Sequence, residues 1–136
     1  MPSFPPLDFK TLAGILAPGS APLKDAKQRT AVSRAYYAAF LTARERLREV
    51  PHFGPVKRHG AHDNVLKALI RSGDPVLTPI GRTLSDLRDM REAADYDLDP
   101  ATLDPTTVTE ALRLSDEVLT DLGSADVSKC VDPRRA

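Results

Sequence analysis

The segment REAADYDL, residues 91 to 98, carries side chains whose types and spacing could do chemistry. Arg91 stands where the apolar spacing of its segment calls for a hydrophobic residue, so its guanidinium must be paired or must reach water. Asp95 follows one helical turn later, on the same face, and can accept hydrogen bonds from Arg91. Two interpretations stay open: an ion pair at a helix end, or a cleft in which Arg91 meets a phosphate or a partner.

Histidines provide a second candidate. His59 and His62 are three residues apart, a spacing that could hold a metal ion on a helix. The sequence shows no evident third ligand, so we predict no metal site and interpret the segment as a solvated helix start. Arg46 and His52 are also close in sequence, but Pro51 separates them at a helix end, and we interpret that spacing as accidental.

The elements that must position these residues are helices. Apolar residues recur every three or four positions in four segments, and no segment of useful length alternates as a strand does. The expected helices cover residues 22–50, 60–71, 79–96 and 105–122. Short connections between them predict an all-α, antiparallel four-helix up-and-down bundle. Thr78 and Asp104 are the expected N-caps of the last two helices.

Proline and glycine mark the limits of this bundle. Five of the twelve prolines fall in the first 22 residues, which predicts an N-terminal arm over residues 1–21 with a short extra helix at LDFKTLAGIL. The bundle is expected over residues 22–122. Gly123 ends it, and residues 123–136 are predicted to form a mobile polar C-terminal tail.

Composition excludes several classes of protein. The 19 basic and 19 acidic side chains cancel, so no strong overall field draws the chain to nucleic acid or to an acidic membrane. Cys130 is the one cysteine, which rules out a disulfide framework. No apolar run approaches the roughly 18 residues that span a bilayer, and no glycine-rich phosphate loop is present. We expect a cytoplasmic protein without a cofactor and without membrane contact.

Three motifs together resemble HEPN domains, the helical nucleotide-binding domains of higher eukaryotes and prokaryotes. They are SRAYYAAFLTARERL (33–47), KRHG (57–60) and LSDLRDMREAADY (84–96), and the similarity covers about residues 22–122. The most similar branch is the small stand-alone group with RAYYA in its first helix and R..ADY in its third. The resemblance implies a bundle of four to five helices, a homodimer, and a gene beside a minimal nucleotidyltransferase in a toxin–antitoxin or defence module.

The resemblance also implies a catalytic pattern. Active HEPN domains are metal-independent RNA endonucleases that use an arginine, four to six intervening residues and a histidine. Arg91 matches the arginine, but Tyr96 stands in place of the histidine. A tyrosine with an ordinary pKa of about 10 is a poor base at neutral pH. Leu98 stands where a related branch has a tyrosine that accepts a nucleotide. The catalytic set carried over is Arg91, Asp95 and Tyr96, a degenerate one.

A binding surface follows from the same resemblance and from the nearby rings and charges. Core packing is the alternative interpretation for Tyr37, and simple solvation is the alternative for the charges. The expected RNA- or nucleotide-binding residues are Arg34, Tyr37, Arg44, Lys57, Arg58 and His59. We predict a HEPN component of a prokaryotic module that binds a nucleotidyltransferase, a nucleotide or RNA. An endoribonuclease with a variant Arg91/Asp95/Tyr96 site and a purely structural helical adaptor are the competing hypotheses.

Overall fold

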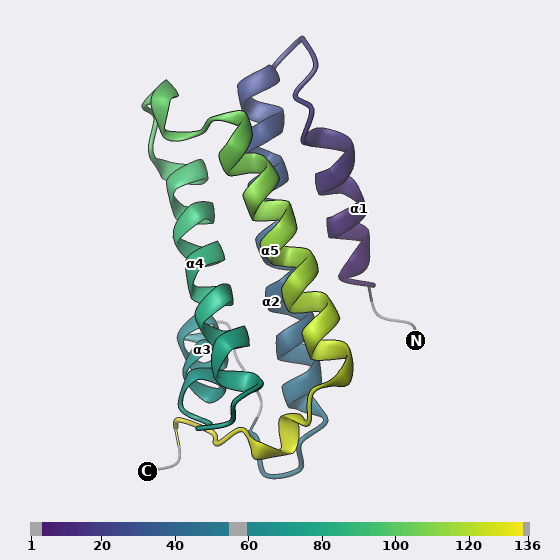
Figure 1. The fold of residues 1–136 in the computed structure, drawn as a ribbon, viewed down its shortest axis with the longest axis vertical. Helices are drawn as coiled ribbons and strands as arrows, with labels where there is room; N and C mark the ends of the chain where they lie inside the picture. The colour runs from purple at the N-terminus through teal and green to yellow at the C-terminus, as the bar shows by residue number, and fades with distance from the viewer. Residues whose placement is uncertain (1–3, 55–59, 135–136) are drawn as a thin grey trace.

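The computed structural model describes residues 4–54 and 60–134, and the all-α prediction is confirmed there, with no strand in these ranges. The helices are α1 (Leu7–Leu16), α2 (Lys24–Arg48), α3 (Ala61–Ile70), α4 (Leu77–Tyr96) and α5 (Pro105–Ser124), with short 3-10 helices η1 (Pro100–Thr102) and η2 (Val127–Lys129). α2, α4 and α5 span the molecule, whereas α3 is confined to one end (Figure 1). None of these helices is long and apolar enough to cross a membrane.

The long helix α2 is the centre of the bundle. It packs against α1, α4 and α5, while α3 packs mainly on α4. α1 and α4 run in one direction and α2 and α5 in the other (Figure 1). The inward faces of α2 are rich in fully buried alanines, which let neighbouring helices approach closely. These buried alanines of α2 are Ala31, Ala35, Ala38, Ala39 and Ala43.

α3 and α4 cross closely at Gly81. A Cβ atom built on Gly81 would lie 2.7 Å from Cγ1 of Ile70 and 2.9 Å from Cβ of Leu69. Both of these side chains belong to α3, so only glycine fits at this crossing. The glycine therefore fixes how near the C-terminal end of α3 can lie to α4.

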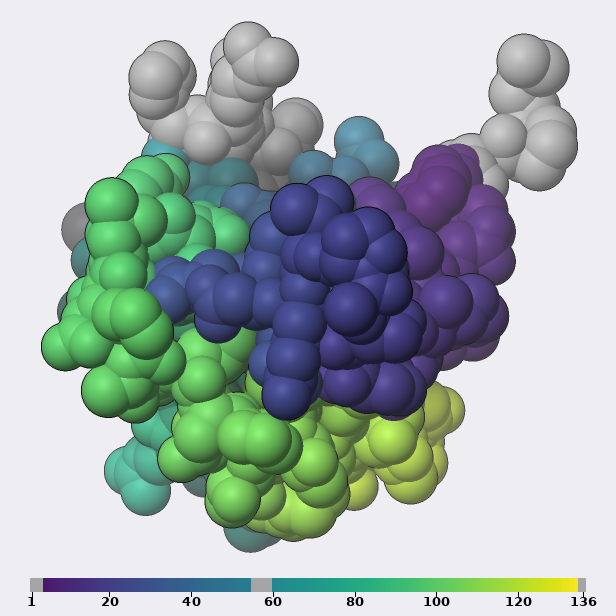
Figure 2. Space-filling view, turned by 90° about the horizontal axis from the view of Figure 1, so that it is seen from above, coloured from purple at the N-terminus to yellow at the C-terminus, as the bar shows by residue number. Residues whose placement is uncertain are grey.

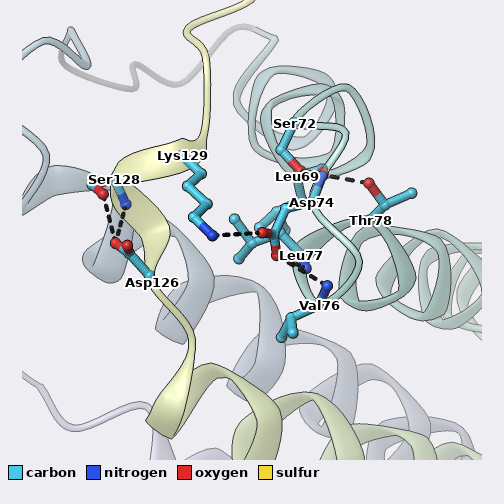
Figure 3. Close-up of polar contacts among 9 residues, drawn as sticks. All are labelled: Leu69, Ser72, Asp74, Val76, Leu77, Thr78, Asp126, Ser128 and Lys129. Atoms are coloured by element: carbon cyan, nitrogen blue, oxygen red, sulfur yellow. Dashed lines mark hydrogen bonds and ion pairs between the residues drawn. The ribbon is translucent and has the colours of Figure 1, made fainter.

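α4 begins two residues before the predicted Pro79, and its cap is a different residue. Oδ2 of Asp74 accepts hydrogen bonds from the backbone N–H groups of Val76 (2.9 Å) and Leu77 (3.0 Å). Thr78, the expected cap, instead donates its hydroxyl to the carbonyl of Ile70 at 3.1 Å (Figure 3 shows these side chains). The Thr78 prediction is wrong because Asp74 already satisfies the exposed N–H groups of the first turn.

The predicted cap of α5 is confirmed. Oδ1 of Asp104 accepts from the backbone N–H of Thr107 at 2.7 Å, and Pro105 occupies the first helical position. Proline is favoured there because its missing N–H would have had no partner within the helix.

Arg29 of α2 closes the far end of α4. Figure 2 looks onto this end of the molecule, where the α1–α2 and α4–α5 connections meet. The guanidinium donates to the backbone carbonyls of Ala94 (3.0 Å), Asp97 (2.5 Å) and Asp99 (3.2 Å). Its Nε donates to Asp25 at 2.8 Å. Carbonyls at a helix C-terminus have no partner within the helix, so Arg29 satisfies them and holds the connection against α2.

Arg46 of α2 satisfies carbonyl groups at the C-terminal end of α5 in the same way. Its guanidinium donates to the carbonyl oxygens of Leu122 and Ala125. After the end of α2, Nε2 of His52 lies 3.0 Å from the carbonyl oxygen of the buried residue Cys130. Arg46 and His52 thus contact the end of α5 and the segment that follows it, in keeping with an accidental spacing.

The C-terminal segment packs against the body of the protein rather than forming the mobile tail that its composition predicted. Asp132 is 2% exposed and accepts from the backbone N–H of Gly54 at 3.0 Å. Hydrogen bonds from Arg134 hold the pKa of Asp132 well below its usual range. Lys129 also pairs with Asp74 at 3.2 Å (Figure 3). The pattern of apolar residues does not predict polar contacts of this kind.

Candidate functional site

Tyr36 and His62 form the centre of a cluster between α2, α3 and α4. Tyr36 is fully buried, and its Oη lies 2.5 Å from Nδ1 of His62. A buried phenol needs a hydrogen-bond partner, and the first turn of α3 supplies one. Burial raises the pKa of Tyr36 above its ordinary value, although Arg88 and Arg91 act in the opposite direction. The phenol therefore keeps its proton and is able to donate it to Nδ1.

Aromatic rings hold the imidazole in place. The ring of His62 stacks on Phe40, with centroids 4.2 Å apart and planes inclined by 14°. It also stacks at 5.6 Å on Tyr36 and meets Tyr37 edge-on at 5.9 Å. The half-buried imidazole is thereby fixed on three sides, and the prediction of a solvated helix start is wrong for this residue.

The charge state of His62 follows from its surroundings. Burial lowers its pKa below the ordinary value, and the positive charges of Arg88 and Arg91 lower it further. The imidazole is consequently neutral at neutral pH. With Nδ1 as the acceptor from Tyr36, the ring proton of the neutral imidazole is on Nε2.

Two arginines on successive turns of α4 border this cluster. Nη1 of Arg88 lies 2.7 Å from Oδ1 of Asp63, and its Nε is 3.5 Å from Glu92. Nη1 of Arg91 lies 3.2 Å from Oδ2 of Asp95, and its Nη2 is 3.6 Å from Glu92. The Arg91 side chain is 12% exposed and that of Asp95 is 32% exposed. The structure thus brings Arg91 and Asp95 together as an ion pair at the edge of the bundle.

Arg88 and Arg91 each have an Nε donor that makes no hydrogen bond within the described residues, although that of Arg88 lies 3.5 Å from Glu92. Both Nε atoms are buried. The Arg91 guanidinium also lies 5.7 Å from the ring centroids of Tyr36 and Tyr37. A buried N–H without a partner is costly, so such a group calls for a water molecule, an ion or a ligand.

The third residue of the expected catalytic set lies elsewhere. Tyr96 is the last residue of α4 and is 76% exposed, and Leu98 is 84% exposed. Within the described residues, Tyr96 makes none of the ring or hydrogen-bond contacts of the Tyr36–His62 cluster. Arg91 is therefore partly enclosed, whereas Tyr96, which was expected to act with it, faces solvent.

Some of the expected binding residues adjoin this cluster. The Arg34 guanidinium lies between two rings, 4.6 Å from the centroid of Phe9 on α1 and 4.9 Å from that of Tyr37. Arg44 pairs with Glu45 at 3.3 Å, and its Nε is buried without a hydrogen-bond partner among the residues described. Lys57, Arg58 and His59 lie outside the described residues.

His62 and Arg88 are the site residues that sequence reasoning missed. One signal was available: Tyr36 lies on the buried stripe of its helix, so its hydroxyl needed a polar partner from elsewhere in the chain. The sequence could not say that this partner is His62, 26 positions away. Among the described residues, no group of three or more histidine, cysteine, aspartate or glutamate side chains is arranged to hold a metal ion.

The fold and the site together define an all-helical bundle with an arginine-bordered tyrosine–histidine cluster. The chain is 30% identical over 132 residues to the uncharacterized protein MJ0628 of Methanocaldococcus jannaschii, covering 88% of this chain and 78% of that protein. The chain belongs to the same family as this archaeal protein. No family model matches it, and no solved structure matches it significantly.

Proposed function

We propose that the protein is a HEPN-type module that binds RNA or a nucleotide through Arg88, Arg91 and the ring of Tyr37. The observation that carries the proposal is the pair of buried Nε donors on Arg88 and Arg91, both without a hydrogen-bond partner in the described residues. Guanidinium groups suit phosphate oxygens, and rings such as Tyr37 suit nucleobases. As a HEPN component of a toxin–antitoxin or defence module, it would act beside a minimal nucleotidyltransferase partner.

Cleavage of RNA is not part of this proposal. The family's route needs a group that exchanges protons near neutral pH beside the arginine. Tyr96 is exposed, and its neighbour Asp95 is already engaged with Arg91. The competing hypothesis, an endoribonuclease built from Arg91, Asp95 and Tyr96, would require the tyrosine to act as that group.

A homodimer belongs to the same proposal. The long helix α2 packs against α1, α4 and α5. α1 offers the better surface, because Leu7 and Ile15 are 60% and 71% exposed and lie two helical turns apart. Light scattering of the purified protein should therefore give about twice its 14.8 kDa mass, and a monomer at micromolar concentration would exclude the dimer.

Binding is tested by fluorescence anisotropy with a labelled single-stranded RNA of mixed sequence, at two salt concentrations. We expect Arg88→Ala and Arg91→Ala each to weaken binding by about tenfold, the effect of losing roughly one charge-assisted contact. Arg113→Ala is the matched control, because Arg113 is an exposed arginine on α5 paired with Glu110 and Glu117. Its affinity should stay within about twofold of wild type. Equal losses in all three variants would mean that only overall charge matters.

A further inference from the structure

We propose that His62 is a third binding group of this site, donating its Nε2–H to the phosphate ester that Arg88 and Arg91 bind. The inference rests on the proposed function and deepens it. It assigns a ligand contact to a residue of α3 and defines the ligand by its phosphate group, whether in RNA or in a free nucleotide.

The first support is the orientation of the ring. Nδ1 of His62 is occupied by the buried Oη of Tyr36, 2.5 Å away, so this edge of the imidazole faces the core. Nε2 lies on the opposite edge of the ring, and the side chain is only half-buried. The N–H that remains for a ligand is therefore on the outward edge.

The second support is that the two arginines lie next to the same groups as His62. Arg88 binds Asp63, the residue directly after His62, at 2.7 Å. The Arg91 guanidinium lies 5.7 Å from the rings of Tyr36 and Tyr37, and His62 contacts the same two rings. Arg91 thus lies beside the tyrosine rings that His62 contacts, and Arg88 binds the residue next to His62.

The third support is rigidity. The imidazole is stacked on Phe40 at 4.2 Å and hydrogen-bonded to Tyr36, so little conformational freedom is left to lose when a ligand binds. Arg91 is likewise held by Asp95 at 3.2 Å, while its Nε stays without a hydrogen-bond partner in the described residues. Asp63 and Asp95 occupy the Nη1 atoms, whereas one oxygen of Glu92 lies 3.5 Å from Nε of Arg88 and 3.6 Å from Nη2 of Arg91. A phosphate would therefore take the place of Glu92 beside the two guanidiniums.

We expect the protein to take up a proton at His62 when the phosphate binds. The groups that face His62 are Tyr36 and Tyr37 from α2, Asp63 from α3, and Arg88, Arg91 and Glu92 from α4. In the free protein, burial and the two guanidiniums lower the pKa of His62. A bound phosphate places negative charge against those guanidiniums and favours the imidazolium, so the pKa rises. Binding then takes up a proton and becomes tighter as the pH falls.

The decisive experiment follows the imidazole nitrogen signals of His62 by NMR in the full-length wild-type chain between about pH 5 and 8, where histidine titrates. Two probes are added in turn: hexauridylate without a terminal phosphate, whose phosphodiesters stay ionised, and adenosine 5′-monophosphate. We expect the free protein to show hydrogen on Nε2, and at least one probe to raise the pKa of His62 by about half a pH unit or more. His52, whose Nε2 contacts the Cys130 carbonyl, is the internal control and should not move.

Affinity measurements provide the second arm. Wild-type protein should bind hexauridylate more tightly at pH 6 than at pH 8, by up to about threefold for a half-unit rise in the pKa of His62, and His62→Gln should lose this difference while His52→Gln keeps it. If a probe binds but the His62 signals and pKa stay unchanged, the inference is overturned while the proposed function stands. If neither probe binds, both fail. Should His62→Gln not fold, the wild-type titration alone decides.

Discussion

Oη of Tyr36 and Nδ1 of His62 lie 2.5 Å apart, although one atom belongs to the 25-residue helix α2 and the other to the first turn of the ten-residue helix α3. This is a polar contact within a group of stacked rings. It gives the buried hydroxyl of Tyr36 a partner and holds the imidazole of His62 against α2.

Tyr36→Phe should lower the free energy of unfolding by about 1–2 kcal/mol, because it removes the donor to Nδ1 and leaves that nitrogen without a partner. Urea denaturation measures the change. Tyr96→Phe is the matched control, since Tyr96 is 76% exposed, and it should change stability by less than about 0.5 kcal/mol. Similar effects of the two substitutions would show that the hydroxyl of Tyr36 does not stabilise the fold.

Arg91 and Asp95 should be energetically coupled. Truncating one member of a partly buried pair leaves the other without its partner, so the losses of the two single variants should sum to more than the loss of the double variant. In a double-mutant cycle with Arg91→Ala and Asp95→Ala, we expect a coupling free energy above roughly 0.5 kcal/mol. Strictly additive losses would mean that the 3.2 Å contact contributes nothing to stability.

Stability should fall as the pH drops from about 7 to about 5, partly because of His62. The pKa of His62 in the folded protein lies below its ordinary value of about 6.5. Below that ordinary value the unfolded chain binds a proton that the folded protein excludes, so protonation favours unfolding. Above it, both states are neutral at His62 and the effect vanishes. Urea titrations of His62→Gln should give a shallower pH dependence over this interval, and an unchanged slope would contradict the assignment.

Gly81→Ala should destabilise the protein by about 1–3 kcal/mol, because the new methyl group would overlap atoms of Ile70 and Leu69 at the α3–α4 crossing. Gly14→Ala is the control, as a Cβ there meets nothing within 4 Å. In an exposed stretch of helix the same substitution should raise stability by about 0.5–1 kcal/mol. If both substitutions stabilised the protein, α3 would not lie as close to α4 as the structure has it.

We predict no metal-independent RNA cleavage by this chain alone. The assay incubates mixed RNA with the protein and a chelator, alongside Arg91→Ala and Tyr96→Phe. Robust cleavage that both substitutions abolish would favour the endoribonuclease hypothesis instead. Tyr96→His tests whether restoring a histidine creates activity. Cleavage by that variant alone would identify the chain as a nuclease that lacks only its proton-transfer group.

The helices were predictable because their signals are local. The apolar spacing of each helix lies within a few turns, and the Asp104 cap acts on a residue three positions away. The Arg91–Asp95 pair is also local, since one helical turn separates the two residues. The start of α4 was misplaced because Asp74 precedes the helix by three residues and no apolar pattern marks it.

The position of His62 and the packing of the C-terminal segment depend on contacts between residues that are far apart in the sequence. His62 is placed against Tyr36 and Phe40 only because α3 packs where Gly81 permits. The C-terminal segment is held by the hydrogen bond between Asp132 and Gly54, which lie 78 positions apart. Sequence patterns contain no information on such pairings, since any of several polar residues could have been the partner.

Arg29 and Arg46 link α2 by hydrogen bonds to the C-terminal ends of α4 and α5. Helix ends usually fray, and their amide hydrogens exchange with solvent faster than those of the helix centre. Here the last carbonyls of α4 are bound by Arg29 and those of α5 by Arg46, near opposite ends of one helix. Neither α4 nor α5 can unravel from these ends without breaking bonds to α2. Hydrogen exchange at these two ends should therefore require the same opening event that exposes the centre of α2.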